Sequence, residues 1–162
     1  MSSLKKIKMN TEERVKKGVD LFMKGYNCAQ SVAMAFSDIY GLDEELLSRL
    51  AASFGGGIGR MRETCGSACG MFLLAGLETG KTLEHPYPSA TLKRENYELV
   101  QHLAEEFRKT NGSLLCRELL GGTASTAPKP DERTTHYYAT RPCARMVESA
   151  IRIYCSILET KK

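Results

Sequence analysis

Apolar residues recur at intervals of three and four along most of the chain, and glycines or prolines repeatedly interrupt the pattern. The first such stretch follows Asn10, which with Glu13 has capping-box spacing, and it should end at Gly25. The sequence contains no internal repeat. It also lacks the convincing alternation of apolar and polar residues that would indicate a strand. The sequence therefore predicts an all-α fold, a single-domain bundle of roughly six helices with a glycine-rich loop.

The other helices are predicted in the same way, from caps, apolar stripes and breakers. They are expected at 27–41, 43–53, 68–77, 89–109, 114–120 and from Pro142 onward. The helix at 68–77 is rich in small residues, and Gly70 and Gly76 should allow it to pack closely, inside the monomer or across a homodimer. Residues 83–89 read as a connection, and residues 123–140 as the longest loop, either mobile or covering something.

Length and charge limit the classes of protein that this chain can represent. Its 162 residues, 42% of them hydrophobic, suffice for one domain over residues 1–162, and residues 1–10 are expected to form a flexible tail. The polar start argues against a signal peptide, and no apolar stretch is long enough for membrane insertion, so we expect a cytoplasmic protein. The net charge of +4 is spread among acidic residues, so no nucleic-acid partner is expected.

Six cysteines are dispersed over the chain, and only folding can bring them together. Cys28 and Cys143 fall in the first turns of predicted helices, and Cys65 falls just before one. Unpaired N–H groups and the helix dipole stabilise a thiolate at such positions, and Arg60 and Arg62 add positive charge beside Cys65. Cys65 is therefore expected to be the most reactive thiol, with Cys143 as a second candidate redox thiol.

Five segments of the sequence resemble the redox-active C_GCAxxG_C_C family. They are Asn27-Cys28-Ala29-Gln30-Ser31-Val32, Phe54-Gly55-Gly56-Gly57-Ile58-Gly59-Arg60, Thr64-Cys65-Gly66 through Gly70, Cys116-Arg117-Glu118-Leu119-Leu120-Gly121 and Pro142-Cys143. The resemblance runs from about Tyr26 to Val147, and it departs from the family at Ser67, where alanine is usual. It implies a small helical protein with a redox or iron–sulfur role, whose four family cysteines are Cys28, Cys65, Cys116 and Cys143.

Several kinds of chemistry suit these four cysteines. Four thiolates from four elements can hold an iron–sulfur cluster for electron transfer, and they can also ligate zinc in a non-catalytic or structural module. The lack of a Cys-x-x-Cys pair weakly favours iron–sulfur over zinc. Thiol–disulfide exchange needs no metal at all. Both electron transfer and thiol–disulfide exchange imply an unknown redox partner protein. The first would make the chain an electron carrier, and the second an oxidoreductase.

The remaining candidates are read as structural. Cys69 and Cys155 lie at inward helical spacing and are expected to be core residues. The glycine run after Phe54 matches no nucleotide-binding motif, so its glycines are expected to let the backbone approach the cysteines closely. Tyr137 and Tyr138 are candidates to cover a site. The three histidines, none of them spaced for a metal, are expected on the surface at His85, His102 and His136.

Overall fold

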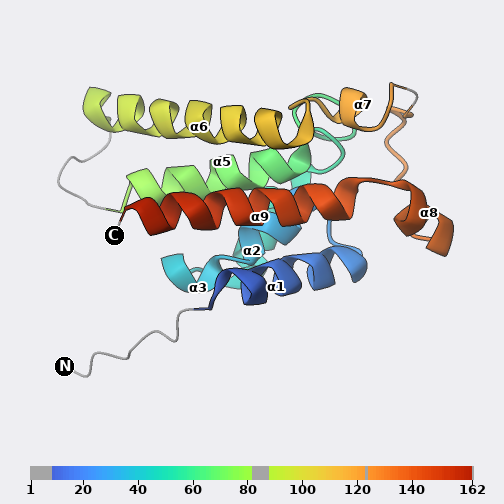
Figure 1. Ribbon diagram of the computed structural model, residues 1–162, viewed down its shortest axis with the longest axis horizontal. Helices are drawn as coiled ribbons and strands as arrows, with labels where there is room; N and C mark the ends of the chain where they lie inside the picture. The colour runs from blue at the N-terminus through green and yellow to red at the C-terminus, as the bar shows by residue number, and fades with distance from the viewer. Residues whose placement is uncertain (1–8, 82–87, 123, 162) are drawn as a thin grey trace.

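The computed structural model describes residues 9–81, 88–122 and 124–161, and these ranges form helices and no strand. The helices, drawn in Figure 1, are α1 (Thr11–Met23), α2 (Cys28–Met34), α3 (Ser37–Tyr40), α4 (Glu44–Ala51), the 3₁₀ turn η1 (Ala52–Phe54), α5 (Gly66–Thr79), α6 (Ala90–Asn111), α7 (Cys116–Leu119), α8 (Thr135–Thr140) and α9 (Cys143–Thr160). Six of the α-helices have seven or more residues, so the all-α prediction is confirmed.

Side-chain caps fix the starts of the first two helices. The Asn10 and Glu13 side chains each accept the other's backbone N–H at 2.9 Å, and Asn27 and Gln30 form the same reciprocal box at the start of α2. Gly41 ends α3 in the left-handed conformation that was expected of it.

The prediction of a single helix at 27–41 is wrong, because the helix is interrupted at Phe36, between α2 and α3. Buried Arg14 donates a hydrogen bond to the Ala35 carbonyl at 2.9 Å and pairs with Asp38 at 2.7 Å. The guanidinium thus binds a carbonyl at the break and compensates for the interruption of the helix.

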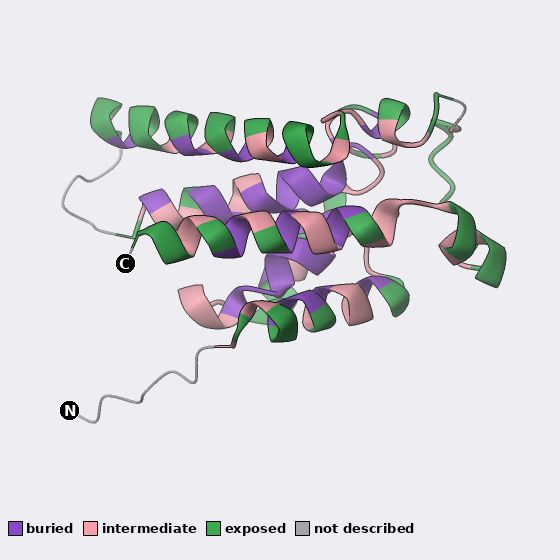
Figure 2. Cartoon of the chain, viewed as in Figure 1, coloured by how far each residue is buried: buried purple, intermediate pink, exposed green. Residues whose placement is uncertain are grey.

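Helices α2 and α5 form the centre of the bundle, and Figure 2 shows them largely buried while the outer face of α6 is exposed. They can approach closely because Gly70 has no side chain: a Cβ there would lie 2.8 Å from Val32 Cβ. Gly70 therefore has its predicted role. Gly76 does not have this role within the monomer, because nothing in the described part of the chain lies within 4 Å of a Cβ added to it. Helix α9 packs against α1, α2, α5 and α6 and closes the bundle.

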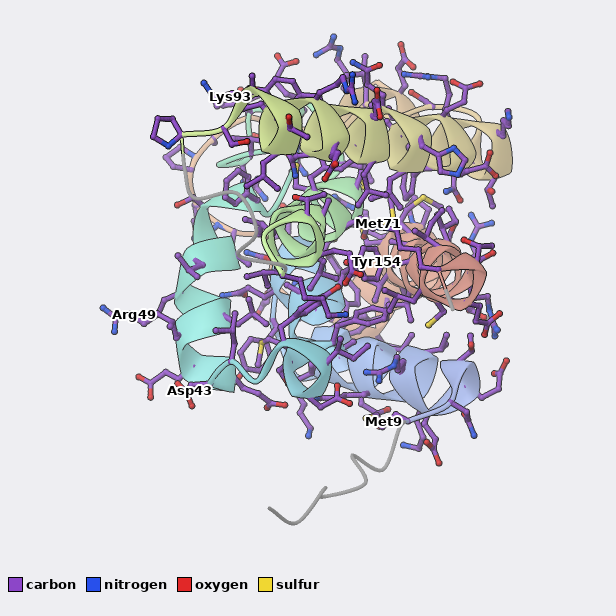
Figure 3. The ribbon with its side chains drawn as sticks, turned by 90° about the vertical axis from the view of Figure 1, so that its left-hand side faces the viewer. Met9, Asp43, Arg49, Met71, Lys93 and Tyr154 are labelled. Carbon is purple, nitrogen blue, oxygen red and sulfur yellow. The ribbon has the colours of Figure 1, made fainter. Side chains whose placement is uncertain are left out.

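The arrangement brings several chain segments to one end of the molecule. In Figure 1 the starts of α5 and α9 lie at the same end as α7 and α8. Seen from the opposite end in Figure 3, α4, which carries Arg49, lies along one side of the bundle and runs across the direction of the long helices. No helix in the described ranges combines the length and apolarity needed to cross a membrane.

Two sequence predictions concern segments between helices. The long loop predicted at 123–140 is interrupted by α8, which Thr134 caps by accepting the Tyr137 N–H at 3.1 Å. Most of the connection predicted at 83–89, including His85, and residues 1–8 of the predicted tail lie outside the described residues. His102 and His136 are exposed, as expected.

Candidate functional site

The four family cysteines line one cavity of about 310 Å³ at the end of the bundle where α5 and α9 begin. Cys28 comes from the first turn of α2, Cys65 from the residue before α5, Cys116 from α7 and Cys143 from the first turn of α9. Cys65 and Cys116 are buried, Cys28 and Cys143 are half-buried, and all four are free thiols. The fold thus gathers residues that are more than one hundred positions apart in the sequence.

A short backbone pairing joins the segments of Cys65 and Cys116. The Cys65 N–H donates to the Leu114 carbonyl at 2.8 Å, and the Cys116 N–H donates to the Glu63 carbonyl at 2.7 Å. Between them, Thr64 and Leu115 form an isolated antiparallel bridge. These bonds are made by the backbone, so no side-chain pattern in the sequence indicated them.

The glycine run forms a left-handed turn against the cysteines. Five consecutive residues, 56–60, have φ between 57° and 74°, and Arg62 follows at 59°. Ile58, Arg60 and Arg62 adopt this conformation despite having a Cβ, which costs about 1–2 kcal/mol per residue. A Cβ on Gly57 would lie 2.6 Å from Cys116 Cβ, so the expected close approach of the glycine backbone to the cysteines is confirmed.

The left-handed turn directs two arginines toward the cavity. Arg62 is buried, and its Nη1 donates to the Cys116 sulfur at 3.7 Å while its Nε donates to the Ser125 carbonyl at 3.0 Å. Arg60 bonds the Ala127 carbonyl at 2.6 Å and pairs with Asp131 at 3.2 Å. Both arginines therefore hold the segment that follows α7 over the cavity.

The segment between α7 and α9 supplies three further charged residues of the cavity, namely Asp131, Arg133 and Arg141. Arg141 pairs with Asp131 at 2.8 Å, and burial of Asp131 is outweighed by Arg60 and Arg141, which hold the pKa of its carboxyl below the usual range. Arg133 donates to the carbonyls of Phe22 and Tyr26, at 3.0 and 3.1 Å, and anchors the segment on α1.

Tyr137 also lines the cavity, so this part of the predicted cover is confirmed. Its partner Tyr138 instead packs edge-on against Phe22, with the ring centroids 6.0 Å apart. Sequence reasoning missed Asp131, Arg133 and Arg141 as site residues. Their dense charge within a loop preceding Cys143 was the available signal.

Cys28 and Cys143 both line the cavity, and each shifts the pKa of the other. The interaction with the Cys28 thiol, together with the positive charges of Arg141, Arg133 and Arg62, lowers the pKa of Cys143 to about 7 against the effect of burial. The same interaction and burial raise the pKa of Cys28 well above its usual value. One member of the pair is thus poised as a thiolate near neutral pH, and the other stays a thiol.

Cys65 does not have the lowered pKa that its place before a helix predicted. Burial raises the pKa of its thiol to about 12, and hydrogen bonds from the backbone N–H groups of Ser67 and Ala68 offset only part of this shift. Burial also raises the pKa of Cys116, although Arg62 opposes it. The helix start does favour a thiolate at Cys65, but desolvation is the larger effect.

Cys69 and Cys155 are described by the structure, and neither lines the cavity. Cys69 is buried in α5 with its sulfur 3.8 Å from the Thr64 carbonyl, and burial raises its pKa to about 11. Cys155 is buried on α9, beside residues of α1. Both therefore lie in core positions.

The fit of the site to a metal can be tested on its donors. Among the described residues, no group of three or more histidine, cysteine or acidic side chains is arranged to hold a metal ion. A single zinc ion needs its sulfur ligands at about 2.3 Å from the metal. The arrangement of the described residues therefore does not support the hypothesis of a zinc ion bound by the four cysteines.

Comparison with known proteins agrees with the motif positions. Residues 26–157 match the model of the family described as "Putative redox-active protein (C_GCAxxG_C_C)". Searches of curated proteins and of solved structures gave no match. The matched region includes Cys28, Cys65, Cys116 and Cys143, and the chain belongs to the C_GCAxxG_C_C family.

Proposed function

We propose that this protein is a thiol–disulfide redox protein in which Cys143 is the attacking thiolate and Cys28 the resolving thiol. The observation that carries the proposal is the placement of Cys28 and Cys143 in one cavity, where their interaction shifts their pKa values in opposite directions. A nucleophile with a pKa near ambient pH combines a large thiolate fraction with good nucleophilicity. Half-burial of both residues leaves them accessible from the cavity.

The reaction is balanced by these two residues and one disulfide substrate. The Cys143 thiolate attacks a substrate sulfur, so that a mixed disulfide forms and the substrate S–S bond breaks. The departing thiolate takes the proton of the Cys28 thiol. The Cys28 thiolate then attacks Cys143 Sγ, forms the Cys28–Cys143 disulfide and releases the second substrate thiolate. Two electrons pass to the substrate, and a dithiol reductant restores the pair by the reverse steps.

The neighbouring arginines assist the attack in two ways. The charges of Arg141, Arg133 and Arg62 stabilise the Cys143 thiolate before the reaction. They also stabilise negative charge on a departing sulfur within the same cavity, where charge–charge interactions are stronger than in bulk water.

An iron–sulfur cluster held by all four cysteines is the second candidate, supported by their placement around one cavity. A cluster distributes its thiolate ligands over a larger volume than a single ion does, and it would supply one-electron transfer. Cys28, Cys65, Cys116 and Cys143 would hold it, and Arg62 would donate to the Cys116 sulfur.

Exchange with a small disulfide reagent tests the proposal in wild type and three variants. Cys143→Ser should slow exchange by at least roughly a hundredfold, as expected on loss of a nucleophile. Cys28→Ser should still attack but accumulate the mixed disulfide, which mass spectrometry detects. Cys69→Ala, a cysteine outside the cavity, is the control and should exchange like wild type.

Iron and sulfide analysis of protein purified without oxygen separates the two candidates. Exchange that survives in Cys143→Ser contradicts the assigned nucleophile. Stoichiometric iron and sulfide, lost on substitution of any of the four cysteines, would instead make electron transfer the function.

A further inference from the structure

Arg62 has a feature that its contacts with the protein do not explain. Its side chain is 6% exposed and lines the cavity, yet its Nη2 is one of two buried side-chain nitrogen or oxygen atoms in the described residues without a hydrogen-bond partner. The Oδ2 of Asp131 lies 3.8 Å from Nη2, which is an ion-pair distance but too long for a hydrogen bond. Leaving a charged donor unsatisfied in a buried position is costly.

The charge balance of the cavity leaves room for an anion. Four arginines line it, namely Arg60, Arg62, Arg133 and Arg141, but the only carboxylate among its lining residues, all of them described, is that of Asp131. Asp131 is shared by Arg60, Arg62 and Arg141, while Arg133 bonds backbone carbonyls. Even with Cys143 as a thiolate, positive charge remains in excess.

The backbone that carries Arg62 is held in a strained conformation. Arg62 has φ 59°, and its N–H bonds the Gly56 carbonyl at 3.2 Å across the left-handed turn. Strained non-glycine residues persist where the surrounding structure fixes them, and they are frequent at binding sites. Here the strain keeps a guanidinium inside the cavity, beside the cysteines, where an ordinary surface loop would let it turn to solvent.

From these observations we propose that the cavity is a binding site for a small anionic disulfide or thiol, whose carboxylate or comparable anionic group accepts a hydrogen bond from Arg62 Nη2. The inference deepens the proposed function and rests on it for the word disulfide, because it places the anion next to the Cys28–Cys143 pair. A cavity of about 310 Å³ suits a small molecule better than a folded protein loop. Arg60 and Arg141, at the same Asp131, add to the attraction.

Binding can be measured separately from reaction. In the double variant Cys28→Ser with Cys143→Ser the proposed exchange pair is absent, and intact mass spectrometry verifies that no covalent adduct forms. Isothermal titration then compares three disulfides: the dicarboxylate 3,3′-dithiodipropionate, the neutral 2-hydroxyethyl disulfide and the cationic cystamine. We expect the dicarboxylate to bind at least roughly tenfold more tightly than either of the others, as a charge-assisted bond to arginine predicts.

Two further substitutions in the same background locate the site. Arg62→Gln should weaken dicarboxylate binding by roughly tenfold or more. Arg49→Gln makes the same change of charge on α4, at an exposed residue that does not line the cavity, and should leave the affinity within about twofold. If circular dichroism shows that Arg62→Gln does not fold, half-buried Arg141→Gln replaces it, with the same expected direction.

Equal binding of the three disulfides, or equal effects of the cavity and α4 substitutions, overturns the anion site. Failure of the proposed function is distinguishable from this result, because it would appear as absent exchange in the protein with intact cysteines while charge-selective binding persisted.

Discussion

The two ends of the helical bundle both bury polar groups, but they treat them differently. At the end opposite the cysteines, Tyr40 donates to Glu78 at 2.7 Å and contacts the hydroxyl of Tyr154, which in turn donates to the Leu74 carbonyl at 3.1 Å. Figure 3 shows Tyr154 in the interior of the bundle, and it is 0% exposed. The hydroxyls of Tyr40 and Tyr154 thus both have hydrogen-bond partners.

The end of the bundle that carries the cysteines contains a buried polar atom without a hydrogen-bond partner, strained backbone and a cavity. Arg62 Nη2 lacks a hydrogen bond, three non-glycine residues have left-handed backbone, and four thiols face a common cavity. The comparison teaches that buried polar groups serve stability where they satisfy one another, and that strain and unsatisfied groups concentrate at the end for which we propose chemistry.

Substitution of Gly57 by alanine tests whether the cysteine end depends on the left-handed turn. The added Cβ would meet Cys116 Cβ at 2.6 Å and Arg62 Cα at 2.8 Å, at a residue with φ 74°. We expect a loss of about 3 kcal/mol in the free energy of unfolding, from strain and overpacking together. Urea unfolding with an unchanged m-value provides the measurement.

Gly59→Ala is the matched control, because φ is 57° there but the nearest atom is 4.0 Å away. It should cost only about 1–2 kcal/mol, the backbone contribution alone. Equal losses for the two variants would show that close packing against Cys116 is unimportant.

The end opposite the cysteines is tested by Tyr154→Phe, which removes one of the two bonded hydroxyls. We expect a loss of about 1.5 kcal/mol in unfolding free energy, because Tyr40 and Leu74 lose a buried partner. The rate of alkylation of Cys143 should stay unchanged, since this hydroxyl lies at the other end. A changed rate would mean that the two ends are coupled, and the comparison would fail.

The smallest effect is expected for Ser67→Ala. Ser67 is fully buried in the first turn of α5, and its Oγ is the second buried side-chain atom in the described residues without a hydrogen bond. Removing an unsatisfied hydroxyl should raise the unfolding free energy, by about 1 kcal/mol at most. Thermal unfolding checks the sign, and a clear loss of stability would reveal a partner for this hydroxyl.

Much of the fold could be predicted because the information is local. Caps such as Asn10 and Asn27, and breakers such as Gly41, act within a few residues, so helix ends followed from the sequence. The break at Phe36 could not be predicted, because it depends on Arg14 from another helix. The helix α8 was missed because its six residues carry too few apolar positions for a helical pattern.

The site divides in the same way. The four cysteines could be named from the motif and helix starts, and the close approach of Gly57 followed from the glycine run. The relative pKa values of the thiols could not be predicted from the sequence, because they depend on burial and on which cysteine lies near the arginines. Burial of Cys65 opposes the expectation that it reacts first, and we propose Cys143 in its place.

Mass-resolved iodoacetamide labelling of the reduced, metal-free protein across a pH series tests this account most directly. A thiol with a lowered pKa reaches its full thiolate fraction at lower pH, so the labelling rate of Cys143 should rise through a midpoint at about pH 7. Cys65 should label last, since burial raises its pKa to about 12. Labelling of Cys65 before Cys143, or a Cys143 midpoint at or above the ordinary cysteine value of about 8.5, would contradict the account.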